Sequence, residues 1–246
     1  MIVQACINGA REASFHPALP LTPDAMAADA AACIAAGAAE IHLHTRGPDG
    51  RESLAAEAVD RTIRLVRKAV PGTLIGISTG EWIEASEERT LSAIAAWRVL
   101  PDYASVNLSE AAAPAVMHQL SVRGVGIEAG LASVGDAERL VGLALERPPL
   151  RILIEIGEQD IGEATDVADR IHAVLDKAGI LRPIQLHGMD DTVWHFARRA
   201  AARRWSTRVG LEDGNTLPDG APAADNAALV RAAVEIYRQG RAAVSQ

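Results

Sequence analysis

The fold is indicated by a unit that first appears complete in residues 22–44, TPDAMAADAAACIAAGAAEIHLH. Thr22 is a suitable N-cap and Gly37 a suitable stop for a helix predicted over residues 23–36. A short segment that fits a strand then follows over residues 40–44. The unit therefore predicts a helix that leads directly into a strand, the pattern of a parallel α/β sheet.

The same alternation runs along all 246 residues. Eight strand–helix pairs, with no linker between them and no Gly-x-Gly-x-x-Gly after the first strand, favour a (β/α)8 TIM barrel over an open doubly wound α/β sheet. We expect a single barrel domain over residues 1–246. The predicted strands are 2–8, 40–44, 73–78, 103–107, 124–128, 150–156, 183–187 and 206–211, and the predicted helices are 23–36, 54–69, 87–99, 112–122, 134–146, 164–178, 192–202 and 223–238.

Composition restricts the partners and the compartment. The net charge of −8 argues against nucleic acid, because phosphate binding needs a basic surface. The sequence has neither an apolar run of membrane-spanning length nor a signal peptide, so no membrane partner is expected. Cys6 and Cys33, the two cysteines, are too few for a disulfide framework, which favours a cytoplasmic protein.

In a TIM barrel, chemistry lies at the carboxyl ends of the strands. His42 and His44 are two apart on the second predicted strand, so both face the barrel mouth and can bind one divalent metal, most simply zinc. The alternative is a pair of core histidines bonded to their neighbours. Glu212, on the same face of the eighth strand as Arg208, can supply an oxygen ligand. Asp213 follows in the turn, where it can pair with Arg208 or act as a base.

Further polar residues close other predicted strands. Hydroxyls and backbone N–H groups beside a glycine can cradle a carboxylate after the third strand. A glutamate at the end of the fifth strand suits a general base, and polar groups on the sixth and seventh strands suit either the core or the surroundings of a metal. These residues are, in chain order, Ser78, Thr79, Gly80, Glu81, Ser105, Asn107, Glu128, Glu155 and His187.

Several segments, in order over nearly the whole chain, together resemble the β-keto acid cleavage enzymes, whose founding activity is 3-keto-5-aminohexanoate cleavage. The resemblance implies a (β/α)8 barrel with a divalent metal, usually zinc, bound by His42, His44 and Glu212. The matching segments are residues 8–10 (NGA), 16–23 (HPALPLTP), 36–38 (AGA), 42–44 (HLH) with Arg46, 48–51 (PDGR), 77–80 (ISTG), 208–213 (RVGLED) and 226–230 (NAALV).

The same resemblance implies a reaction between a β-keto acid and acetyl-CoA that releases acetoacetate and a new CoA thioester. Asp213, held by Arg208, would remove a proton from the keto acid while the metal stabilises the enolate oxygen. The enolate would attack the thioester, CoA would migrate within the adduct, and a reverse Claisen step would split it. Glu128 matches a glutamate that assists proton transfer, whereas Ser78 and Ser105 match positions that hold the substrate carboxylate and keto end. A homo-oligomer is also expected.

The chain departs from the family pattern in four places. Glu81 replaces a second glycine, where a carboxylate would repel a substrate carboxylate unless it turns away. The segment after Asn107 is short, and residues 157–160 (GEQD) replace a glycine-rich loop. The position that reads the distal end of the substrate falls at Arg11 or Glu12. An arginine there suits an acidic substrate, and a glutamate suits an amino-bearing one.

Two other functions remain open. A metal-dependent lyase, aldolase or hydrolase that uses no CoA is favoured by Glu81, Glu155 and His187, which add options for a ligand or a base. A non-catalytic barrel that binds metal or a metabolite is favoured by the shortened loops. The intact Arg208 and Asp213 oppose that second alternative, since binding alone needs no such base.

Overall fold

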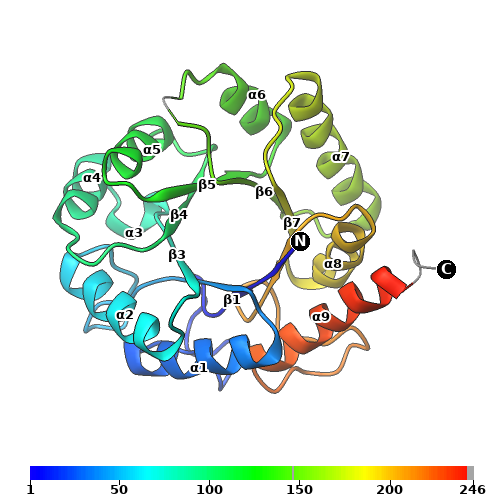
Figure 1. Ribbon diagram of the computed structural model, residues 1–246, viewed down its shortest axis with the longest axis horizontal. Helices are drawn as coiled ribbons and strands as arrows, with labels where there is room; N and C mark the ends of the chain where they lie inside the picture. The colour runs from blue at the N-terminus through cyan, green and yellow to red at the C-terminus, as the bar shows by residue number, and fades with distance from the viewer. Residues whose placement is uncertain (146, 243–246) are drawn as a thin grey trace.

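The computed structural model describes residues 1–145 and 147–242, with eight parallel strands forming a nearly closed barrel inside a ring of helices (Figure 1). The hydrogen-bonded order of the strands is β7-β6-β5-β4-β3-β2-β1-β8. This arrangement confirms the predicted TIM barrel. The strands are β1 (Val3–Cys6), β2 (Glu40–Leu43), β3 (Leu74–Ser78), β4 (Tyr103–Asn107), β5 (Gly126–Leu131), β6 (Arg151–Ile156), β7 (Ile184–Gly188) and β8 (Thr207–Val209).

The helices alternate with the strands and surround the barrel (Figure 1). None of them, within the described ranges, is both long and apolar enough to cross a bilayer. A short helix after β3 and a 3-10 turn after β7 were not predicted. The helices are α1 (Pro23–Ala36), α2 (Ala56–Ala69), α3 (Glu81–Glu84), α4 (Glu87–Ala96), α5 (Ala113–Val122), α6 (Val134–Gly142), α7 (Ile161–Lys177), η1 (Asp190–Thr192), α8 (Val193–Ala202) and α9 (Asn226–Ala242).

The ends of α1 show how local sequence places these elements. The Thr22 side chain accepts a hydrogen bond from the backbone N–H of Ala25 at 3.2 Å, as predicted for an N-cap. Gly37 adopts φ 109° and donates its N–H to Ile34 at 3.0 Å, which ends the helix. The chain then enters β2 after three residues, so both histidines of the HLH segment reach the barrel mouth.

The barrel closes between β7 and β8 through residue 206. The backbone N–H of Ser206 donates to Ile184, and Leu186 donates to Ser206, both at 3.0 Å. The Thr207 hydroxyl adds a bond to the Leu186 carbonyl at 2.8 Å. On its other side β8 pairs in parallel with β1 over Val3–Ala5. The short β8 is therefore held from both sides, which fixes the residues that follow it.

Some predicted boundaries were wrong in ways that matter for the site. β5 continues to Leu131, because the apolar residues Ala129 and Leu131 pair with β6 and are fully buried. Glu128 therefore lies inside the strand and not at its end. α6 ends at Gly142 because Leu143 is extended, and residue 146 of the predicted helix lies outside the described residues. The remaining ends differ by a few residues.

A layer of buried polar side chains fills the barrel interior below the mouth. Arg151 donates from Nη2 to Glu40 at 2.7 Å, and its Nε lies 3.0 Å from Glu128 Oε2. Gln4 donates to Glu128 at 3.2 Å and to the Tyr103 hydroxyl at 2.8 Å. One buried guanidinium thus contacts two buried carboxylates, and burial raises the pKa of one of them, Glu128.

Arg151→Met is expected to destabilise the fold by about 3–5 kcal/mol, because it leaves two buried carboxylates without their cation. Urea unfolding followed by circular dichroism measures the loss. Arg170→Met is the matched control, since Arg170 pairs with Asp166 on the surface, and it should change stability by less than about 0.5 kcal/mol. Equal stability of the two variants would contradict the interpretation.

Candidate functional site

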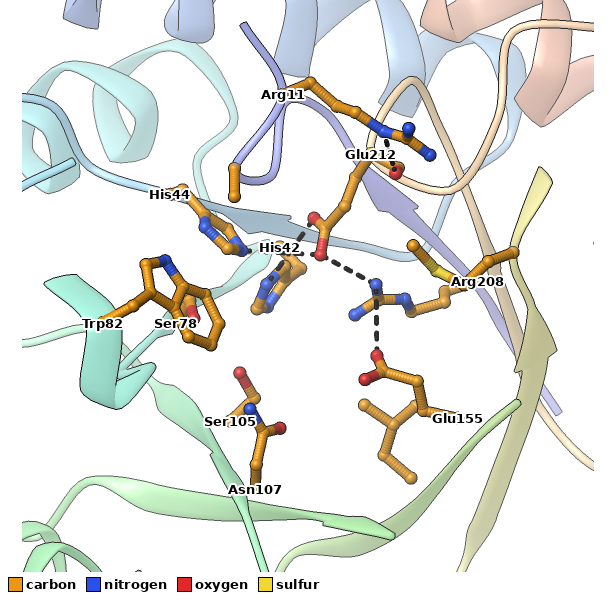
Figure 2. Close-up of a pocket in the computed structure, with 13 residues that line it drawn as sticks. Arg11, His42, His44, Ser78, Trp82, Ser105, Asn107, Glu155, Arg208 and Glu212 are labelled. Carbon is orange, nitrogen blue, oxygen red and sulfur yellow. Dashed lines mark hydrogen bonds and ion pairs between the residues drawn. The ribbon is translucent and has the colours of Figure 1, made fainter. Parts of the chain in front are cut away.

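A cavity of about 260 Å³ opens where the strands end (Figure 2). Seven of the eight strands, or the loops that directly follow them, contribute side chains to it, in keeping with the position of active sites in TIM barrels. Figure 2 shows the histidines and Glu212 on one side, with Ser105 and Asn107 across the cavity. Its lining consists of Ala10, Arg11, His42, His44, Ser78, Trp82, Ser105, Asn107, Leu153, Glu155, Met189, Arg208 and Glu212.

His42, His44 and Glu212 converge in this cavity with their ligand atoms within 4.8 Å of one another. Glu212 Oε2 lies 3.8 Å from His42 Nε2, and Glu212 Oε1 lies 3.4 Å from His44 Nε2. Nitrogen and oxygen ligands at about 2.1 Å from a common tetrahedral ion are about 3.4 Å apart. Glu212 Oε2 is buried with no hydrogen-bond partner in the described parts of the chain. The residues therefore fit a divalent metal that has two nitrogen ligands and one oxygen ligand.

The two histidines differ in their electrostatic surroundings. Burial lowers the pKa of His42 to about 3, so its ring is neutral. Burial also opposes the charged form of His44, but the carboxylates of Glu212 and Glu52 outweigh it and raise the pKa of His44 to about 9. In the metal-free protein His44 consequently carries a proton at neutral pH, between two carboxylates.

Arg208 is buried at the centre of a group of carboxylates. Its Nη2 lies 2.8 Å from Glu212, 2.7 Å from Asp213 and 3.6 Å from Glu155. Burial acts to raise the pKa of Glu212, but Arg208 and His44 hold it well below the ordinary value. Burial opposes ionisation of Glu155 as well, yet its bond with His187 and the charge of Arg208 lower its pKa to about 2. Both carboxylates are therefore ionised.

Asp213 lies behind Arg208 and is fully buried. Its Oδ1 accepts from Arg208 at 2.7 Å and lies 3.4 Å from His187 Nδ1. Its Oδ2 is buried, and no hydrogen bond reaches it from the residues described here. The carboxylate is thus fixed through Oδ1 alone.

Two glycines allow Glu212 to reach the histidines. A Cβ on Gly9, which adopts φ +57°, would lie 2.4 Å from Glu212 Cγ. A Cβ on Gly210 would lie 1.9 Å from the Cys6 carbonyl oxygen, so this stretch can pass β1 only without a side chain. Asn226 secures the turn, because it accepts from the Leu211 N–H at 2.7 Å and donates to the Ile7 carbonyl at 2.8 Å.

The remaining predicted residues divide into those in the cavity and those outside it. Ser78, Ser105, Asn107, Arg11 and Glu155 line it. Thr79 donates its hydroxyl to the Ser105 carbonyl at 2.7 Å, and the Gly80 N–H donates to the Ser78 hydroxyl, so both support the wall from behind. The other three lie elsewhere: Glu81 in a separate cleft beside α3, Glu12 exposed, and Glu128 in the interior layer below.

Two neighbours of His44 were missed by sequence reasoning. Glu52 contacts the Nδ1 atom of His44, and Trp82 lies over the His44 ring with centroids 6.3 Å apart and an interplanar angle of 26°. Glu52 belongs to the loop after β2, which folds back through a bridge between Arg46 and Glu52. No periodicity in the sequence marks such a loop contact.

A profile of the beta-keto acid cleavage enzyme family matches residues 1–245. The chain belongs to this family. Among its curated relatives, the 3-keto-5-aminohexanoate cleavage enzyme of Fusobacterium nucleatum is 37% identical over 81 residues, which cover 32% of this chain and 30% of the relative. The 3-oxoadipate:acetyl-CoA acetyltransferase of Cupriavidus necator is 34% identical over 74 residues, covering 30% and 26%. These alignments thus span about a third or less of either relative.

The family membership agrees with the likeness of the barrel to a solved structure. ObcA, solved in apo form, superposes with a TM-score of 0.73 at 17% identity, over 92% of this chain and 63% of ObcA. ObcA has also been solved as a ternary complex with a C4-CoA adduct and oxalate. At that identity the likeness supports the fold.

The apparent affinity of the protein for Zn²⁺ is expected to rise with pH, because a metal at His44 Nε2 must displace the proton that His44 holds in the metal-free protein. Because the pKa of His44 is raised to about 9, a proton competes with the metal for this side chain at every pH below about 9. Each pH unit between about 6 and 8 should strengthen binding about tenfold, measured with a competing chelator. Calorimetry in buffers of different ionisation enthalpy should count about one released proton. An affinity that is flat over this range would contradict the assignment.

Proposed function

We propose that this chain is a zinc-dependent acyltransferase that cleaves a β-keto acid with acetyl-CoA, giving acetoacetate and a new CoA thioester. The observation that carries the proposal is the convergence, in one cavity of a beta-keto acid cleavage family barrel, of three candidate metal ligands with Arg208, which bonds to the buried Asp213 behind it. We expect the enzyme to work as a cytoplasmic homo-oligomer.

His42, His44 and Glu212 would hold the metal. When bound there, a divalent ion supplies Lewis acidity to the oxygen of an enolate. Asp213 would take the proton from the carbon between the keto and carboxyl groups of the substrate. Arg208 holds the Asp213 carboxylate through Oδ1, and the buried Oδ2, which accepts no hydrogen bond from the described residues, would receive the proton. Glu128, which does not line the cavity, would assist only through residues that lie between it and the mouth.

Polar side chains at the ends of β3 and β4 would bind the reacting end of the substrate. Ser78, Ser105 and Asn107 present hydroxyl and amide groups to the cavity and carry no charge of their own, and the last two lie across it from the histidines (Figure 2). Glu81, whose carboxylate would repel an acid, lies in the neighbouring cleft. The cavity has room for a small keto acid, and most of a CoA molecule would lie outside it.

We propose further that the substrate carries a second acidic group, which Arg11 would bind. Arg11 lines the cavity, whereas Glu12 is exposed to solvent and does not. Arg11 Nε donates to the Glu212 carbonyl at 3.0 Å and Nη2 to Asp190 at 2.7 Å, so the guanidinium is held at the rim. The relative from Cupriavidus necator is named for 3-oxoadipate, an acid of this kind.

A lyase or hydrolase that uses no CoA is the second candidate. The observation that favours it is Glu155, an ionised carboxylate that lines the cavity and bonds to His187 at 3.1 Å. Such a group offers a second base near the metal ligands. Turnover of a keto acid without any thioester would select this function over acyl exchange.

Asp213→Asn is expected to lower kcat by about 10²–10⁴-fold, because the amide cannot accept the proton. The assay supplies acetyl-CoA and a panel of β-keto acids and measures acetoacetate. Asp191→Asn, an exposed residue of the neighbouring loop, is the matched control and should be unaffected. Zinc content is measured in parallel. An Asp213→Asn variant that keeps both metal and activity would refute the assigned base.

Arg11→Met is expected to raise KM for dicarboxylic β-keto acids about 10–100-fold, because a charge-assisted bond is lost. KM for monocarboxylic keto acids should change little. Glu12→Gln serves as the control for a change of charge at the adjacent position. If Glu12→Gln shifts substrate preference and Arg11→Met does not, the substrate is amino-bearing and the dicarboxylic assignment is wrong.

A further inference from the structure

We propose that Glu52 is the positioning residue for the metal ligand His44, and that Trp82 fixes Glu52 in that role. The inference rests on the metal site of the proposed function but not on the acyl exchange. It concerns two residues outside the ligand set, one from the loop after β2 and one from the short helix α3.

The contact between Glu52 and His44 is buried and specific. Oε1 of Glu52 lies against Nδ1 of His44, and the two side chains are 12% and 5% exposed. The loop that carries Glu52 is fixed close to the strand, because the backbone N–H of Ser53 donates to Thr45 at 3.0 Å and the Thr45 hydroxyl donates back to Ser53. Glu52 is therefore held on the side of the imidazole that faces away from Glu212.

Trp82 donates a hydrogen bond to the second oxygen of the Glu52 carboxylate. Its Nε1–H donates to Glu52 Oε2 at 2.9 Å, and its indole lies stacked on the His44 ring (Figure 2). A second bond ties α3 to the loop, from the Leu54 N–H to the Glu84 carboxylate at 2.8 Å. Both oxygens of Glu52 are thus engaged, which leaves its carboxylate one orientation.

This arrangement determines which nitrogen of His44 is available to a metal. With Nδ1–H donated to a carboxylate, the lone pair lies on Nε2, which is 3.4 Å from Glu212 Oε1. A carboxylate on the far nitrogen also makes the ligating nitrogen more basic. His42 has no such support, because its Nδ1 is buried without a hydrogen-bond partner among the residues described. Affinity should therefore depend on the orientation of His44 that Glu52 provides.

The test measures Zn²⁺ dissociation constants by chelator competition on the full chain. Glu52→Ala is expected to weaken binding about 10–100-fold, the range seen for outer partners of metal ligands. Glu52→Gln keeps the volume and an acceptor oxygen and should lie between Glu52→Ala and the wild type. Trp82→Phe keeps a ring over His44 but removes the N–H, so a smaller loss is expected. Glu84→Gln, the matched removal of a carboxylate that touches only backbone in this loop, should stay within about twofold.

Thermal unfolding separates positioning from general stability. Each variant is compared with its own metal-free form, because Glu52→Ala also removes a buried partner of protonated His44 and should lower the Tm of the metal-free protein. The rise in Tm on adding Zn²⁺ should shrink for Glu52→Ala. Wild-type affinity in both Glu52 variants would overturn the inference and leave the metal site standing. A wild type that binds no Zn²⁺ would overturn both. Weakened binding in the Glu52 variants, in a protein without acyl exchange, would support the positioning role and refute only the proposed reaction.

Discussion

A single buried guanidinium allows several neighbouring carboxylates to stay ionised at the mouth of this barrel. Arg208 lies within 3.6 Å of three carboxylates: Glu155, which is partly exposed in the cavity, and Glu212 and Asp213, which are largely buried. Without that cation, burial would drive at least one of these groups to take up a proton, and Glu212 would lose its value as an anionic ligand. Because Arg208 is the central residue of β8, the place of its guanidinium depends on where this three-residue strand is held.

The barrel interior places carboxylates around a buried guanidinium in two separate layers. Below the mouth Arg151 pairs with Glu40 and Glu128, and Gln4 connects this layer to Tyr103. Both layers keep buried carboxylate oxygens without partners in the described parts of the chain, but the residues of the deeper layer do not line the cavity. The two layers therefore use the same residue types, and the difference between them is access to the cavity rather than composition.

The fold and the facing of the two candidate histidine ligands were accessible from sequence because both follow simple periodicities. Alternating helices and strands gave the barrel, and the spacing of two between His42 and His44 put both on one face. Glu128 was misplaced because nothing in the sequence marked the apolar residues 129–131 as a continuation of the strand. The contact of Glu52 with His44 and the direction of the Glu81 side chain depend on how loops fold over the mouth. Such loop contacts produce no periodic pattern in the sequence. The cavity wall was thus predictable where strands supply it and unpredictable where loops do.

The three candidate ligands come from opposite ends of the chain. His42 and His44 lie on the second strand, while Glu212 follows the eighth, more than 160 residues later. During synthesis the two imidazoles would leave the ribosome long before the carboxylate that completes their site. An ion held by all three would require that β8 has docked between β1 and residues of β7, so tight metal capture would follow barrel closure. A chain that stalls before that step carries its histidines without the means to retain an ion.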